Sequence, residues 1–309
     1  MHHSIDQAGA VCIVRFSADG TMIASGSRKT AQVFDVTTGD QKFLASCPGF
    51  ASVDDAEDEY IRALCFSPDC SKLVVGMPDS TLRIWDIASK EESPPLTGHK
   101  SKAYSLDYVH NFIASGSGDR TVRLWDARSG RCAQIFGSEQ GGPSDGVTSV
   151  AFSPDGRLLA AGSLDKGVRI WDTESARLLA RLDGHSDSVY SITFSRDGQS
   201  LLSGSFDSNV MLWDVNGHGQ TPTRPRTVFQ GHKDFVLAVA HSPDGRYFMS
   251  GSKDRSVVFW DPRSSRSVLT LAGYRNSVIS VASSHASPYF ATGSGDCFTA
   301  VWKYKHQTM

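Results

Sequence analysis

Serine, histidine and aspartate recur together in this sequence, and these are the residue types of a nucleophilic hydrolase triad. Three sets share one order and nearly one spacing, and each ends in a tryptophan: His99, Ser115, Asp119 and Trp125; His185, Ser203, Asp207 and Trp213; His232, Ser250, Asp254 and Trp260. An active site needs one set, whereas three equivalent copies indicate a role repeated in the fold. A buried tryptophan needs an acceptor for its indole N–H, so we expect each set to form a structural hydrogen-bond chain.

Other catalytic and metal-binding signatures are absent from the sequence. It contains no G-x-S-x-G, H-E-x-x-H or phosphate-loop motif, and its cysteines form no C-x-x-C pair. We therefore predict no catalytic residue, no metal and no cofactor, and a protein that is not an enzyme. We expect reduced thiols, typical of an intracellular protein, at all six cysteines: Cys12, Cys47, Cys65, Cys70, Cys132 and Cys297.

Charge and hydropathy narrow the classes of partner. The formal net charge is −2, the isoelectric point is about 6.5, and no basic run is long enough to follow a phosphate backbone. Direct DNA binding is therefore not expected. No apolar stretch reaches the roughly 18 residues of a membrane helix, and the first residues do not form a signal peptide. We expect a soluble protein without membrane contact.

The elements that position these residues form a repeat. Six tryptophans each follow an aspartate by six residues, at Trp85, Trp125, Trp171, Trp213, Trp260 and Trp302. A seventh, divergent copy ends at Phe34. The repeat of roughly 45 residues, with strand-like patterns throughout, is typical of a four-stranded propeller blade. The sequence thus predicts an all-β, seven-bladed propeller.

We predict a single domain over residues 1–309. Its repeats are expected at approximately 10–48, 60–96, 100–136, 146–182, 188–229, 235–271, and 277–304 plus 2–6. A single blade would expose the apolar side chains on both faces of its sheet to water, so each blade depends on its neighbours to bury them. The last copy ends at its third strand, and we expect residues 2–6 to supply its outer strand and close the ring.

A ring of variable residues is the predicted binding surface. In each repeat the first strand starts with an apolar anchor, and the next residue should lie at the mouth of the central channel. This rule gives Cys12, Arg62, Tyr104, Thr148, Tyr190, Leu237 and Ile279. Tyrosine, arginine and aliphatic side chains at exposed positions are typical of interface hot spots. The alternative is that several of them pack only against their own loops.

Certain stretches are more specific than the repeat itself. They include "AYSLDY", "GSGDRTVRLWD", "GHKDFVLAVA", "GSKDRSVVFWD" and "RNSVISVA". Together they resemble the C-terminal WD-repeat propeller of the fungal Tup-type general transcriptional corepressors, relatives of animal Groucho proteins. The resemblance implies a nuclear adaptor that DNA-binding repressors recruit through the channel mouth. Carried over motif by motif, the family's contact residues fall on Cys12, Arg62, Tyr104, Leu164, Tyr190, Leu237, Lys253 and Asn276.

The resemblance also implies further partners. They are a tetratricopeptide-repeat co-subunit, histones and histone deacetylases. The family carries an N-terminal helical segment and a glutamine-rich region, whereas this chain begins at the propeller, so we expect co-subunit binding to need a region outside it. The sequence leaves open whether the chain is a fragment or a natural short form.

Two other functions would use the same fold. A substrate receptor or scaffold of a ubiquitin ligase or another nuclear complex would bind at the same mouth. Receptors of acidic or phosphorylated peptides use several arginines, however, and Arg62 stands alone in the predicted ring. A propeller enzyme would need convergent polar groups, and the predicted ring is mostly apolar.

Overall fold

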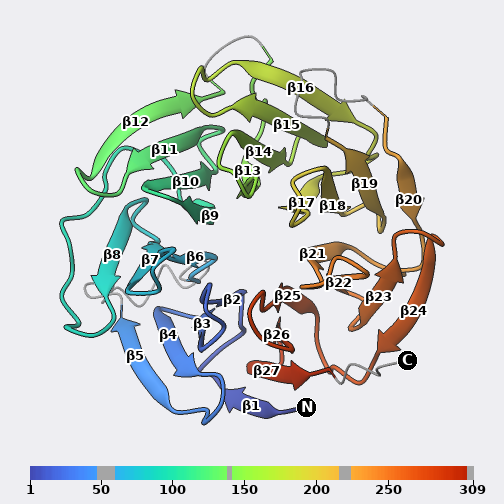
Figure 1. The fold of residues 1–309 in the computed structure, drawn as a ribbon, viewed down its shortest axis with the longest axis horizontal. Coiled ribbons are helices and arrows are strands. Elements are labelled where there is room, and N and C mark those ends of the chain that lie inside the picture. Colours follow the sequence, from blue (N-terminus) through green and yellow to red (C-terminus); the bar gives the residue numbers. More distant parts are fainter. Residues whose placement is uncertain (47–59, 138–140, 216–223, 305–309) are drawn as a thin grey trace, which may run out of the picture.

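Seven β-sheets surround a central channel in the computed structural model, which describes residues 1–46, 60–137, 141–215 and 224–304 (Figure 1). Six sheets have four strands and one has three. The described residues contain no helix, and none of them could therefore form a helical membrane span. The prediction of an all-β, seven-bladed propeller is confirmed.

Within each blade the strands follow one another outward from the channel. The innermost strands are β2 (Ile13–Phe16), β6 (Ala63–Phe66), β9 (Ala103–Val109), β13 (Val147–Phe152), β17 (Val189–Phe194), β21 (Val236–His241) and β25 (Val278–Ser283). The second strands are β3 (Met22–Gly26), β7 (Lys72–Gly76), β10 (Phe112–Ser117), β14 (Leu158–Ser163), β18 (Ser200–Ser205), β22 (Phe248–Ser252) and β26 (Tyr289–Ser294).

The third and outer strands complete the blades. The third strands are β4 (Thr30–Asp35), β8 (Leu82–Asp86), β11 (Val122–Asp126), β15 (Gly167–Asp172), β19 (Val210–Asp214), β23 (Val257–Asp261) and β27 (Phe298–Lys303). The outer strands are β5 (Gln41–Ser46), β12 (Arg131–Phe136), β16 (Leu178–Asp183), β20 (Thr227–Phe229), β24 (Arg266–Leu271) and β1 (His3–Asp6). We number the blades 1 to 7 from β2 to β25. In the three-stranded blade 2, two isolated bridges, Leu82 to Leu96 and Trp85 to Glu92, stand where the outer strand would be.

The ring closes between the two ends of the chain. Strand β1 pairs antiparallel with β27, with His3 opposite Val301 and Asp6 opposite Phe298, and so becomes the outer strand of blade 7 (Figure 1). Two backbone hydrogen bonds flank this pairing, from His2 N to Val301 O (2.7 Å) and from Gln7 N to Cys297 O (2.8 Å). The predicted closure by the N-terminal strand is therefore confirmed.

Burial between blades accounts for the repeated glycine of the second strand. A Cβ atom on Gly204 in blade 5 would lie 2.7 Å from Val236 and 3.0 Å from Val239 in blade 6. Val236 is fully buried, and it is the apolar anchor at the start of its inner strand. Any larger residue at Gly204 would push the two blades apart, so the glycine sets the distance between neighbouring sheets.

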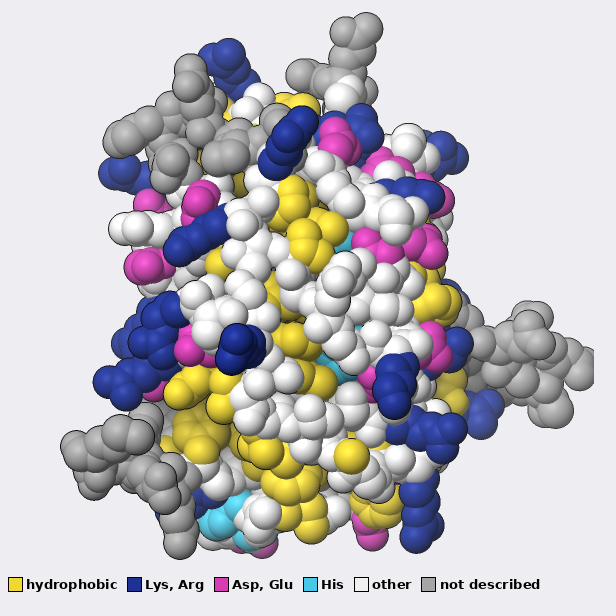
Figure 2. All heavy atoms as spheres, turned by 90° about the vertical axis from the view of Figure 1, so that its right-hand side faces the viewer, with side chains coloured by type: hydrophobic (Ala, Val, Ile, Leu, Met, Phe, Trp, Pro, Cys, Tyr) yellow, Lys and Arg dark blue, Asp and Glu magenta, His cyan; other side chains and the backbone are white. Residues whose placement is uncertain are grey.

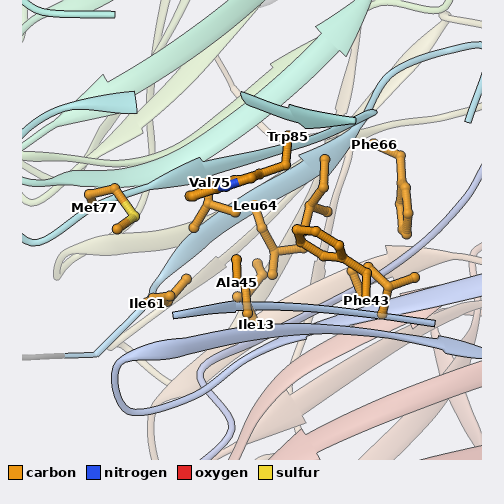
Figure 3. Packing of buried hydrophobic residues seen from close by; sticks show 13 residues of the cluster. Ile13, Phe43, Ala45, Ile61, Leu64, Phe66, Val75, Met77 and Trp85 are labelled. Carbon is orange, nitrogen blue, oxygen red and sulfur yellow. The ribbon is translucent and has the colours of Figure 1, made fainter. Parts of the chain in front are cut away.

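Figure 3 shows the packing between blades 1 and 2. The rings of Phe43 and Trp85 lie with centroids 6.4 Å apart, and Ile13, Ile61 and Val75 belong to the same buried cluster. Similar clusters lie between the other neighbouring blades. The core is thus a series of interblade layers, and it leaves the channel free to carry a site.

The outer wall of the ring is chemically mixed. Figure 2 shows the side that carries β20 and β24, where charged, polar and apolar side chains alternate. The described cysteines, Cys12, Cys65, Cys70, Cys132 and Cys297, are free thiols.

Candidate functional site

The three Ser-His-Asp sets form hydrogen-bond chains of nearly identical geometry. In blade 3, Trp125 Nε1 donates to Ser115 Oγ (2.8 Å), His99 Nε2 lies 2.7 Å from the same oxygen, and His99 Nδ1 lies 2.8 Å from Asp119 Oδ2. In blade 5 the corresponding distances for Trp213, Ser203, His185 and Asp207 are 2.8, 2.7 and 2.8 Å. In blade 6 those for Trp260, Ser250, His232 and Asp254 are 2.7, 2.7 and 2.8 Å.

These distances match a catalytic triad, but the environment of the serine does not. Ser115 is fully buried, and its oxygen accepts the indole N–H of Trp125. Asp119 accepts further hydrogen bonds from the backbone N–H groups of Lys100 (2.9 Å) and Thr121 (3.0 Å). A nucleophilic serine must reach a substrate carbonyl, and this one has no open side. The set joins two strands, a turn and a loop, as expected for a structural role.

In blades 7 and 1, different residues form hydrogen bonds with the buried polar side chain of the second strand. In blade 7, Tyr274 replaces the histidine, and Thr292 Oγ1 lies 3.0 Å from the Tyr274 hydroxyl and 3.2 Å from Trp302 Nε1. In blade 1, Gln7 Nε2 donates to Ser25 Oγ (3.0 Å). Both replacements keep the buried polar groups of the second strand paired.

The predicted ring residues line one cavity at the mouth of the channel. This cavity of about 280 Å³ is lined by Cys12, Arg62, Tyr104, Thr148, Leu164, Tyr190, Leu237 and Ile279. They come from all seven blades because each lies at the start of an inner strand or, for Leu164, in the turn before the third strand. One expectation needs correction: these side chains are half-buried, not exposed. The channel wall covers one side of each and leaves the other toward the mouth.

Arg62 and Tyr190 narrow the mouth from opposite blades. Burial raises the pKa of Tyr190, and the charge and hydrogen bond of neighbouring Arg62 lower it in part. The Thr148 hydroxyl is directed at the backbone, 2.6 Å from Val189 O and 3.1 Å from Gly162 O. A ligand at this mouth would therefore meet aromatic and aliphatic side chains, the guanidinium group of Arg62, which Tyr190 engages, and that of Arg15, which also lines the cavity.

Two residues implied by the family resemblance lie outside the cavity. Lys253 is exposed, with Nζ 4.6 Å from the centroid of the Phe235 ring and 3.9 Å from Asp234 Oδ2. Asn276 is also exposed, and its Oδ1 accepts the N–H of Ser277 (2.8 Å). Both belong to turns beside the channel, so they could meet only a ligand that extends beyond the mouth.

Sequence reasoning missed an aromatic stack on blades 5 and 6. The ring of Phe206 lies parallel to those of Tyr190 (centroids 5.0 Å apart) and Phe235 (4.4 Å apart). Phe206 also lines the mouth cavity. The sequence held a signal for it, because Phe206 precedes the turn aspartate Asp207 just as Leu164 and Lys253 precede theirs. The stack extends the apolar surface from the channel outward to Lys253.

Comparisons with known proteins agree with this architecture. The profile of the family described as WD domain, G-beta repeat matches residues 2–35, 50–86, 91–126, 130–172, 176–214, 223–261 and 265–303. Each matched segment ends with the third strand of a blade.

Three curated relatives are transcriptional regulators by name. The chain is 50% identical to the general transcriptional corepressor tupA of Dictyostelium discoideum over 48% of its length. It is 45% identical to the transcriptional repressor rco-1 of Neurospora crassa over 34%, and 41% identical to the general transcriptional corepressor TUP1 of Saccharomyces cerevisiae over 35%. The aligned segments cover 25%, 17% and 22% of these relatives, so each match spans only part of the relative's length.

Proposed function

Because the chain belongs to the WD domain, G-beta repeat family, and because its similar relatives are named as corepressors, we propose that it is a protein-interaction platform for transcriptional repression. In this role it has no chemistry of its own. DNA-binding repressor proteins would dock at the channel mouth and recruit the protein to their target genes, which requires that it act in the nucleus.

The single observation that carries the proposal is the composition of the mouth cavity. Tyr104, Tyr190 and Phe206 line it together with the aliphatic Leu164, Leu237 and Ile279. Aromatic and aliphatic side chains around a concave surface favour binding of apolar side chains from a peptide. Arg62 is engaged with Tyr190, and Arg15 is the one other arginine among the described residues that line the cavity. Because phosphopeptide receptors use several arginines, this lining favours an apolar peptide.

Further partners enter the proposal through the family resemblance. They are histones, histone deacetylases and a tetratricopeptide-repeat co-subunit. Lys253 and Asn276 would extend the repressor contact beyond the mouth, since both are exposed beside it. None of these contacts requires the buried hydrogen-bond sets of blades 3, 5 and 6.

The experiment that tests the proposal measures peptide binding directly. Peptides tiled along DNA-binding repressors would be screened against the purified chain, and binders compared with a Tyr104→Ala, Tyr190→Ala double variant. We expect the double variant to lose about 2 kcal/mol or more of binding free energy, as truncated hot spots do. A matched variant, Tyr247→Ala, changes a half-buried tyrosine at the other end of the inner strands and should bind normally.

Thermal unfolding separates binding from folding in this experiment. Tyr104 should contribute little to stability, whereas Tyr190 also stacks on Phe206, so each single variant needs its own melting temperature. Weaker binding with an unchanged melting temperature for Tyr104→Ala supports the proposal. If no repressor peptide binds, or if the Tyr247 variant loses as much affinity, the mouth is not the recruitment site.

A further inference from the structure

The channel opens at its other end into a second, larger cavity that the proposed function does not use. This lower cavity has a volume of about 650 Å³, within the range of roughly 300 to 1,000 Å³ typical of small-molecule sites. It is lined by the far ends of the inner strands and by the turns that follow them, including Arg15, Asp107, Arg196, His241 and His285. Arg15 lines both cavities and therefore lies between them.

The charged side chains of the lower cavity are predominantly basic. Two guanidinium groups, Arg15 and Arg196, face one carboxylate, Asp107. That carboxylate is already engaged, because Asp107 Oδ2 accepts the N–H of Phe152 (2.7 Å) and Oδ1 accepts the N–H of Tyr108 (2.9 Å). Burial also raises the pKa of Asp107. The cavity therefore has more positive charge than its single acid balances.

Both guanidinium groups keep most of their hydrogen-bonding capacity. Among the described residues, Arg15 makes one hydrogen bond, from Nη1 to Val14 O (3.1 Å), and no ion pair within 4.0 Å. Arg196 likewise makes one, from Nη1 to Pro243 O (3.2 Å). A guanidinium carries five N–H donors in a fixed plane, and that geometry matches the oxygen atoms of phosphate and carboxylate groups. Donors without protein acceptors thus line this cavity.

Two of the three histidines that line this cavity, His241 and His285, add further N–H donors. Burial lowers the pKa of His241 to about 4, and it also lowers the pKa of His285, with Arg196 lowering the latter further. Both imidazoles are therefore neutral near pH 7 and can each donate one N–H. The Nε2 atom of His241 is buried and has no hydrogen-bond partner among the described residues. A buried polar atom without a partner favours a ligand that would supply one.

We propose that the lower cavity binds a small oxyanionic molecule, one that carries phosphate or carboxylate groups, with Arg15 as its principal contact and Arg196 as the second. The excess of basic side chains, the unused guanidinium donors and the volume all favour this class of ligand. Asp107 opposes it through its negative charge and therefore limits the affinity.

The test titrates the purified chain by calorimetry with two probes, inorganic pyrophosphate and citrate, at low ionic strength. Pyrophosphate and citrate distinguish a phosphate site from a carboxylate site, and sodium chloride of equal ionic strength controls for screening. We expect one probe to bind, Arg15→Met to weaken its binding tenfold or more, and Arg196→Gln to weaken it severalfold. Asp107→Asn should tighten binding, an effect that general damage to the fold would not produce.

Arg62→Met is the matched control, because Arg62 is the corresponding arginine at the opposite mouth. It should leave anion binding unchanged. Should Arg15→Met fail to fold, the opposite effects of Arg196→Gln and Asp107→Asn still decide the question. The proposal is overturned if neither probe binds, if Arg62→Met loses as much binding as the lower-cavity variants, or if Asp107→Asn leaves affinity unchanged. None of these outcomes depends on repressor binding.

Discussion

Arg169 donates two hydrogen bonds to Asp165 across one turn of blade 4. Arg169 Nη1 lies 3.0 Å from Asp165 Oδ1, and Nη2 lies 2.8 Å from Oδ2. Both side chains are almost fully buried, at 1% and 7% exposed. Blade 4 has Ala161 where blades 3, 5 and 6 have the bonded serine. The arginine reaches the turn aspartate in place of the histidine, and its Nε also donates to Gly141 O (2.7 Å). An arginine–aspartate ion pair thus takes the place of the Ser-His-Asp hydrogen-bond chain.

Removing this arginine should be costly. Arg169→Met would leave Asp165 buried without its cation, and breaking a buried pair in this way destabilises by about 3–5 kcal/mol. Blade 2 offers the control, because Arg83 pairs with Asp79 at 3.1 Å but both side chains are partly exposed (20% and 32%). Arg83→Met should cost only about 0–1 kcal/mol. Urea unfolding of both variants measures the free energy of unfolding that each one loses. Equal losses would contradict a stabilising role for the buried Arg169–Asp165 pair.

The Ser-His-Asp chains give a second prediction about stability. His232→Ala would remove the partner of Ser250 and Asp254 and leave buried polar atoms unpaired, which costs about 1–3 kcal/mol. His110→Ala, at an exposed histidine, serves as the control and should leave the melting temperature nearly unchanged. The His232 variant should bind repressor peptides normally once folded. Lost binding at full stability would mean that the set has a recognition role.

The sequence predicted the fold because burial between blades requires the same residue types in every copy. Gly204 and Val236 illustrate this, since their contact fixes both identities and recurs around the ring. Replacements within the hydrogen-bond sets keep the spacing of the repeat: Tyr274 precedes Thr292, and Gln7 precedes Ser25, by the 18 residues that separate His185 from Ser203. The spacing identifies these positions, but it does not show which hydrogen bond a tyrosine or a glutamine makes there.

The mouth was predictable only in part. The offset from each apolar anchor identifies Tyr104 and Tyr190 because the backbone of every inner strand has the same path. Phe206 and Phe235 stack through turns that vary between blades, and no repeat position fixes their ring orientation. The lower cavity was not predicted at all. Its charge depends on which blades carry Arg15, Arg196 and Asp107, and only closure of the ring brings these blades together.

Acid should destabilise the protein through His241. Burial lowers its pKa from 6.5 to about 4, Asp197 opposes that shift and His285 adds to it. Between pH 6.5 and 4 the unfolded chain therefore binds a proton at this residue that the folded protein does not. Stability should fall over this window as the pH decreases, by at most roughly 3 kcal/mol from His241. Above pH 6.5 the residue should have no effect.

His241→Gln tests this pH dependence, because glutamine keeps polar atoms at the site without titrating. Denaturant unfolding at intervals from pH 7 to pH 4 should show a flatter profile for the variant than for the wild-type chain. His285→Gln, measured in parallel, shows how much His285 contributes to the pH dependence of stability. Parallel profiles for the wild-type chain and His241→Gln would show that His241 is not held neutral by burial.

The closure between β1 and β27 should be the weakest joint of the ring. β1 is a terminal strand of four residues with alternating exposed positions, whereas β23 in blade 6 pairs with β24, the next strand along the chain. A terminal strand frays more readily than one held by a hairpin. Hydrogen exchange should show the amides of residues 299–303 opening faster than those of residues 257–261.

Ile5 provides the variant that tests this joint. It is the residue of β1 that packs against the buried cluster containing Val11, Val14 and Val301. Ile5→Ser should weaken only this docking and speed exchange at residues 299–303 while residues 257–261 keep their rates. Leu269→Ser on β24 is the control, because Leu269 is 51% exposed and contributes little to packing. Equal protection of both strands in the wild-type chain, unchanged by Ile5→Ser, would show that β1 closes the ring as firmly as a hairpin does.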